Sequence, residues 1–126
     1  MEKKHSVLIV DDEPANIQVL SHALGDEYKL FAATNGPDAI EAAVKHLPDI
    51  ILLDIIMPEM DGYEVVAALK SSDTTKNIPV IFLTAKDGPE NESLGLEHGA
   101  DDYIFKPFSR GLLLQRVKMH LAFGRF

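Results

Sequence analysis

Residues 48–65, PDIILLDIIMPEMDGYEV, place a single carboxylate in the middle of an apolar run. After Asp49, the segment 49–53 is apolar without alternation, which is typical of a strand covered on both faces. Asp54 follows this segment directly, and apolar residues resume at Ile55. The stretch therefore predicts a central buried strand that delivers one acid to the edge of a sheet.

Four more short apolar runs occur along the chain, at 7–10, 29–33, 79–83 and 103–105. Segments of helical period separate them, and we predict helices at 14–25, 37–47, about 63–70, about 89–98 and 109–121. Strands that alternate with helices indicate a parallel sheet with helices on both faces. The sequence thus predicts one doubly wound α/β domain, in which a strand followed by a helix occurs five times. Function in such a fold lies in the crevice at the carboxyl ends of the strands.

Length and composition narrow the class of protein. A chain of 126 residues with 46% hydrophobic and 25% charged residues is expected to form one soluble globular domain. Twenty acids against 12 Lys and Arg give a net charge of −8, which argues against direct binding of nucleic acid. There is no Cys, so disulfides and thiolate metal sites are excluded. The N-terminal apolar run is too short for a signal peptide or a membrane span, and we expect a cytoplasmic location.

Polar side chains follow four of the five predicted strands. Asp11 and Asp12 follow the first, Asp54 the third, Thr84 the fourth and Lys106 the fifth. Any one of them alone would be an ordinary capping or loop residue. Because the carboxyl ends of parallel strands meet at one edge, we expect all of them to share a crevice.

The chemistry of this set favours a metal and a phosphoryl group. Three clustered carboxylates repel one another and need a cation, and oxygen ligands suit Mg²⁺. An Asp carboxylate can attack phosphorus, and Asp54 is the best nucleophile because Asp11 and Asp12 form a pair suited to the metal. Lys106 and Thr84 would stabilise the charge on the phosphoryl oxygens.

The chain resembles the receiver domain of bacterial two-component response regulators. The matching stretches are VLIVDDEPAN at 7–16, PDIILLDIIMPEMDGYEV at 48–65, IPVIFLTAK at 78–86 and GADDYIFKPF at 99–108. The resemblance implies a flavodoxin-like fold with strand order 2-1-3-4-5. It also implies that residues 1–126 are one receiver domain, with its body at about 5–122 and a short helix extension or the start of a linker at 122–126.

The resemblance implies a role for each acid. Asp54 matches the phosphoacceptor, which takes a phosphoryl group from a sensor histidine kinase or a phosphotransfer protein. Asp11 and Asp12 match the acidic pair that binds Mg²⁺ together with Asp54, with Asp12 as the direct ligand. The backbone carbonyl of Ile56 matches the main-chain metal ligand.

The remaining matches concern the phosphoryl contacts and the switch. Thr84 and Lys106 match the hydroxyl and the ammonium that contact the phosphoryl group. Tyr103 matches an aromatic switch residue that moves inward as Thr84 shifts, although on the sequence alone a rim aromatic with a solvated hydroxyl is the simpler expectation. The Lys106–Pro107 peptide bond is expected to be cis, as is typical of the family.

The family is regulatory, so we expect a phosphoacceptor domain rather than an enzyme. Its output surface is formed by the fourth helix, the fifth strand and the fifth helix. Leu112, Leu113 and Leu114 are consecutive, so one helix stripe cannot bury them all, and some are expected to face a second copy or a further segment. Control of an output domain outside this sequence and a stand-alone phosphorelay shuttle both stay open.

Two positions are expected to set the lifetime of the phosphate. In the family these are the second residue after the acceptor, here Ile56, and the second after the hydroxyl, here Lys86. An apolar side chain and a long cation there would hinder the attacking water, which predicts a long lifetime.

Two other classes fit the sequence poorly. A haloacid-dehalogenase phosphatase needs a second acid at the position of Ile56. A flavin-binding domain needs a phosphate loop after the first strand, where the acids at 11–13 would repel the phosphate.

Overall fold

Five parallel strands form one sheet in the computed structural model, which describes residues 4–85 and 97–123. The strands run in the order β2-β1-β3-β4-β5, and every neighbouring pair is parallel. Their bounds are β1 Ser6–Val10, β2 Lys29–Ala33, β3 Ile50–Leu53, β4 Val80–Thr84 and β5 Asp102–Phe105. The predicted fold class and strand order are confirmed.

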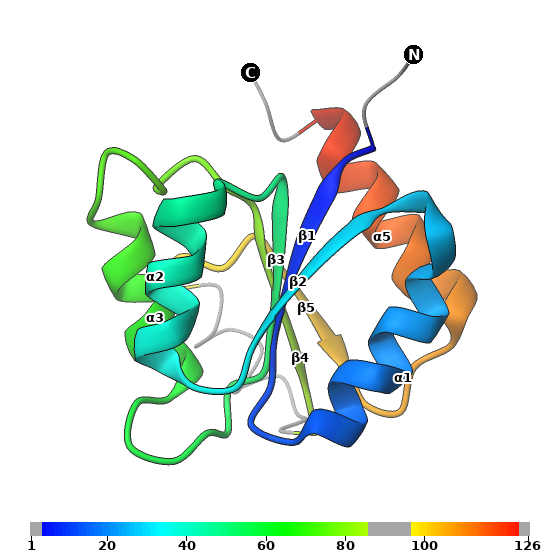
Figure 1. The fold of residues 1–126 in the computed structure, drawn as a ribbon, viewed down its shortest axis with the longest axis horizontal. Coiled ribbons are helices and arrows are strands. Elements are labelled where there is room, and N and C mark those ends of the chain that lie inside the picture. The colour runs from blue at the N-terminus through cyan, green and yellow to red at the C-terminus, as the bar shows by residue number, and fades with distance from the viewer. Residues whose placement is uncertain (1–3, 86–96, 124–126) are drawn as a thin grey trace.

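The sheet is covered by helices on both faces (Figure 1), as the lack of alternation in its strands requires. The helices within the described residues are α1 Pro14–Leu24, α2 Gly36–His46, α3 Gly62–Lys70 and α5 Arg110–Phe123. Figure 1 shows α2 and α3 on one face and α1 and α5 on the other. Each face has its own hydrophobic core. Most of the predicted helix at 89–98 lies outside the described residues.

Local signals explain where these helices begin and end. Pro14 occupies the first turn of α1, and a short 3₁₀ turn, Gly25–Glu27, follows its last residue. The side chain of Asn35 caps α2 by accepting the Asp38 N–H at 2.8 Å. α3 begins with a reciprocal capping box between Asp61 and Glu64.

The apolar residues of helix α5 are buried to different degrees. Leu113 is fully buried, while Leu112, Leu114 and Leu121 are partly buried and pack against the same core. One helix stripe thus fully buries only the middle of the three consecutive leucines, and the other two keep part of their surface exposed. Pairing of two copies through this region stays a prediction. No helix in the described part of the chain is long and apolar enough to cross a membrane.

Candidate functional site at the carboxyl edge of the sheet

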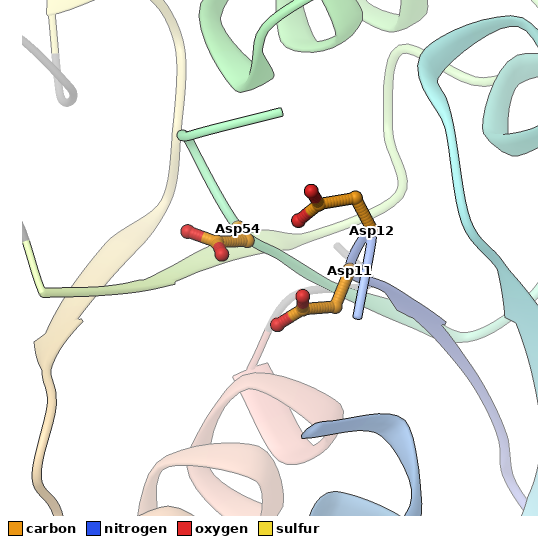
Figure 2. A group of neighbouring side chains, drawn as sticks. All are labelled: Asp11, Asp12 and Asp54. Atoms are coloured by element: carbon orange, nitrogen blue, oxygen red, sulfur yellow. The ribbon is translucent and has the colours of Figure 1, made fainter. Parts of the chain in front are cut away.

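Three carboxylates converge at the ends of β1 and β3. One oxygen each from Asp11, Asp12 and Asp54 lies within 4.8 Å of the others (Figure 2). The pairing of β1 with β3 enforces this cluster, because Val10 lies opposite Leu53 and the Asp54 N–H donates to the Val10 carbonyl at 3.0 Å. Asp11 is only 1% exposed, so the sheet holds a charged group almost out of water.

One ammonium group lies among these acids. The Lys106 Nζ is 3.2 Å from Asp11 Oδ2 and 3.7 Å from Asp54 Oδ2. The Lys106 N–H donates to the Thr84 carbonyl at 2.9 Å, which fixes the residue just beyond β5. Thr84 is fully buried at the end of β4, near enough to Asp54 to lower the pKa of its carboxyl. Among the described residues, Lys106 is thus the cation paired with this cluster of three acids, and these four side chains together carry more negative than positive charge.

The Asp54 carboxyl has a pKa above that of an ordinary aspartate. Burial raises the pKa of Asp54, and the negative charge of Asp11 adds to the rise. Lys106 and the hydrogen bonds from the Ile56 N–H and Thr84 oppose it without cancelling it. A bound cation would favour the charged form of all three acids.

The donor set fits a hard divalent cation. Carboxylate oxygens are the ligands that Mg²⁺ prefers, and it commonly takes only one or two of them while it keeps several waters. Among the described residues, the Asp12 carboxylate takes no hydrogen bond or ion pair, so it can turn to an ion. Ile56 lies two residues beyond Asp54 with its side chain 56% exposed, and the role of its carbonyl as a ligand stays a prediction.

The loop between β3 and α3 packs closely against the backbone of Asp54 and Ile55. The Gly62 N–H donates to the Ile55 carbonyl at 2.8 Å. A Cβ on Gly62 would lie 2.7 Å from both the Asp54 carbonyl oxygen and the Ile55 Cα. Within the same loop, Glu59 adopts a left-handed φ of 67°. Only glycine fits at position 62 without a clash, because a side chain there would push away the backbone that carries Asp54.

The predicted switch residue is buried behind Thr84. Tyr103 is 5% exposed, and its ring packs against Phe82 and Phe105 at centroid distances of 6.1 and 5.0 Å. The expectation of a solvated rim aromatic is therefore wrong. The Lys106–Pro107 peptide bond is cis, as the resemblance implies.

A half-enclosed apolar cavity of about 440 Å³ borders the site. It is lined by Asn16, Val19, Leu20, Ala85, Lys106, Pro107 and Phe108. Val19 is 63% exposed, which is unusual for a large apolar side chain on a helix. The surface beside the acids is therefore apolar on the α1 side.

Sequence reasoning missed a half-buried polar cluster at the start of β5, formed by Asp102, Arg116 and His120. Asp102 accepts hydrogen bonds from Arg116 at 2.8 and 3.0 Å and lies 2.9 Å from the His120 Nε2. Burial alone would raise the pKa of Asp102, but the bonds from His120, the Tyr103 N–H and Arg116 hold it below its usual value. The i, i+4 spacing of Arg116 and His120 on α5 was the available signal, since it puts both on one helix face.

Comparison with known proteins agrees with this site. The family model of the response regulator receiver domain matches residues 7–118, and the chain belongs to this family. A response regulator from Chloroflexus aurantiacus has a TM-score of 0.90 and 36% identity, with 95% of this chain and 99% of that one covered. The receiver domain of a sensor histidine kinase from Pseudomonas aeruginosa has a TM-score of 0.87 and 27% identity, over 95% of this chain and 99% of that one. Its structure contains a magnesium ion coordinated in the active site cleft.

The curated relatives are much longer than this chain. A Vibrio cholerae protein named "Probable cyclic di-GMP phosphodiesterase" is 51% identical over 116 residues, which are 92% of this chain and 26% of that protein. The chain thus spans about a quarter of the length of the curated relatives that it matches. The match concerns the receiver domain, a regulatory module.

We expect Gly62→Ala to lower the free energy of unfolding by about 1–3 kcal/mol, because the new methyl group meets backbone atoms that cannot yield cheaply. Urea unfolding followed by circular dichroism measures the change. The matched control is Gly111→Ala in α5, where the atom nearest to the new Cβ is the Ser109 Oγ, 4.0 Å away. An unchanged stability in Gly62→Ala would show that the loop is not tightly packed.

The raised pKa of Asp54 predicts that its ionisation destabilises the folded state, by an amount that depends on pH. Between the ordinary carboxyl pKa and the raised one, the unfolded chain releases its proton first, so stability falls as the pH rises. Without divalent metal, Asp54→Asn should therefore melt above the wild type at pH 7, and the difference should shrink as the pH falls below the ordinary value.

Thermal melts at several pH values test this prediction. Asp73→Asn, at an exposed side chain far along the chain, is the control for the loss of one charge. Equal melting temperatures of Asp54→Asn and wild type at pH 7 would contradict the predicted penalty.

Proposed function

We propose that Asp54 accepts a phosphoryl group from the phosphohistidine of a sensor histidine kinase or a phosphotransfer protein. The observation that carries this proposal is the convergence of Asp11, Asp12 and Asp54 at the carboxyl edge of the sheet, where the Lys106 ammonium pairs with two of them. Within the described residues three acids thus share one paired cation, which a structural ion pair would not need and a phosphoryl site with a divalent ion would.

The residues have separate tasks in this transfer. An Asp54 oxygen attacks phosphorus, the bond from phosphorus to the donor's imidazole nitrogen breaks, and that nitrogen keeps the electron pair. Lys106 already lies 3.7 Å from Asp54 and is placed to neutralise one phosphoryl oxygen. Thr84, buried at the end of β4 close to Asp54, would donate its hydroxyl to another phosphoryl oxygen. A bound Mg²⁺, held by Asp12, Asp54 and the Ile56 carbonyl, would supply further positive charge to the phosphoryl oxygens.

The phosphoryl group would act on the rest of the domain through Thr84. When this hydroxyl turns to the phosphoryl group, it leaves room that an inward Tyr103 fills. An inward Tyr103 packs against Phe82 and Phe105, and phosphorylation would raise the population of this arrangement over an outward one rather than create a new fold. The surface that responds includes β5 and α5.

The phosphohistidine donor would approach Asp54 across an apolar surface. The exposed side chains of Val19 and Ile56 and the cavity beside Lys106 border the route to Asp54. A helical donor with apolar residues around its phosphohistidine fits this surface. The length of the curated relatives supports control of an output domain in the same polypeptide over a stand-alone shuttle.

Incubation with a small acyl phosphate and Mg²⁺ should add one phosphoryl group to the chain. Intact mass spectrometry measures the addition, which should be lost in Asp54→Ala and when a chelator removes the metal. Asp61→Ala is the matched control, because this nearby acid caps α3 and takes no part in the cluster. An addition that persists in Asp54→Ala would place the acceptor elsewhere.

The phosphorylated domain should lose its phosphate slowly. Ile56 places an exposed apolar side chain beside the acceptor, which hinders a water from reaching phosphorus. We expect Ile56→Asn to shorten the half-life several-fold, measured as loss of phosphate from the isolated domain with Mg²⁺ present. Val44→Asn, at another exposed apolar position, controls for surface polarity.

The same half-life in Ile56→Asn and wild type would refute this role. Lys86, the second predicted position, lies outside the described residues, and its contribution stays a prediction. The double variant Ile56→Asn with Lys86→Ala tests both positions together.

A further inference from the structure

Three consecutive acids, Asp11, Asp12 and Glu13, lie between β1 and α1. All three carboxylates are within a few residues of the metal site, yet they do not share the same surroundings. Asp11 is buried, Asp12 is half-buried and Glu13 is exposed. The contacts of each carboxylate therefore determine which of the three is available to the ion.

Asn16 contacts the two outer acids of this run. Its side-chain Nδ2 lies 3.4 Å from Asp11 Oδ1 and 3.4 Å from Glu13 Oε2. These are long hydrogen bonds, but an amide NH₂ has two hydrogens and can donate to both oxygens at once. The backbone supports the arrangement, since the Asn16 N–H donates to the Glu13 carbonyl at 3.0 Å.

The position of Asn16 follows from the helix. Pro14 begins α1, so Asn16 lies in the first turn, where its half-buried side chain reaches back over the turn from β1. The Glu13 N–H donates to the same Asp11 Oδ1 at 3.0 Å, and Lys106 holds Oδ2 at 3.2 Å. Asp11 is thereby fixed at both oxygens, and Asn16 completes this set of donors.

We propose that Asn16 is a positioning residue of the divalent-cation site. It ties Asp11 and Glu13 back to α1 and leaves the Asp12 carboxylate between them to meet the ion. This inference rests on the proposed Mg²⁺-dependent function. Its physical basis is the repulsion between neighbouring carboxylates, which a shared pair of N–H donors offsets at low cost.

The consequence of losing Asn16 is local. Without the Asn16 donors, the Glu13 N–H is the partner that Asp11 Oδ1 keeps among the described residues, and the turn that presents Asp12 to the ion is held less firmly. Glu13 becomes free to move over the entrance, where its charge would meet the incoming phosphoryl group. Residues that orient the ligands of a metal commonly change its affinity by 10–100-fold when they are replaced.

Asn16→Leu tests the proposal, because it keeps the size of the side chain and removes both donors. We expect the dissociation constant for Mg²⁺ to rise about tenfold in calorimetric titration without phosphodonor. We also expect the ¹⁵N resonance of the Glu13 amide to move in the metal-free variant, since this N–H bonds the carboxylate that Asn16 orients. Gln18→Leu, the same kind of change at an exposed position of α1, should do neither.

A second variant keeps the test decisive if Asn16→Leu folds poorly. Asn16→Ser retains one hydroxyl donor and should bind Mg²⁺ with an affinity between those of wild type and Asn16→Leu. Wild-type affinity in both variants would overturn the role of Asn16 and leave the proposed function intact. Absence of Mg²⁺ binding by the wild type itself would instead refute the metal site on which the proposed function depends.

Discussion

The attraction between the Lys106 ammonium and the carboxylates of Asp11 and Asp54 is the interaction on which this site depends. Lys106 lies 3.2 and 3.7 Å from these two acids, on the opposite side of the crevice. The parallel sheet makes this meeting possible, because β1, β3 and β5 all end at the same edge. Within the part of the chain that the structure describes, this one ammonium is paired with a cluster of three acids, and the remaining negative charge is what the proposed cation would offset.

Much of this arrangement is readable from the sequence. Unbroken apolar runs predict buried parallel strands, and the residue after each strand belongs at the carboxyl edge. That reasoning places Asp11, Asp12, Asp54, Thr84 and Lys106 in one crevice, and the structure brings them together there. The strand order came from family resemblance, since nothing in the hydrophobic pattern says which strands are neighbours.

The rest depends on contacts between residues distant in the chain. The burial of Tyr103 is decided by Phe82 on the neighbouring strand, and no local pattern carries that information. Asp102 lies 14 residues before Arg116, and the pair forms only because α5 packs over β5. The share of each α5 leucine that the core covers is likewise not readable from the sequence, since the width of the apolar surface beneath a helix is a property of the whole core.

Tyr103 is 5% exposed, and its ring packs against Phe82 of β4 and Phe105 of β5. Under the proposed switch, an outward ring would give up these aromatic contacts and expose apolar surface to water. That cost is set by the packing between two neighbouring strands and does not depend on the phosphoryl group. Substitutions of Phe82 or Phe105 would therefore change the balance between the two positions of Tyr103 without altering any residue of the acidic cluster.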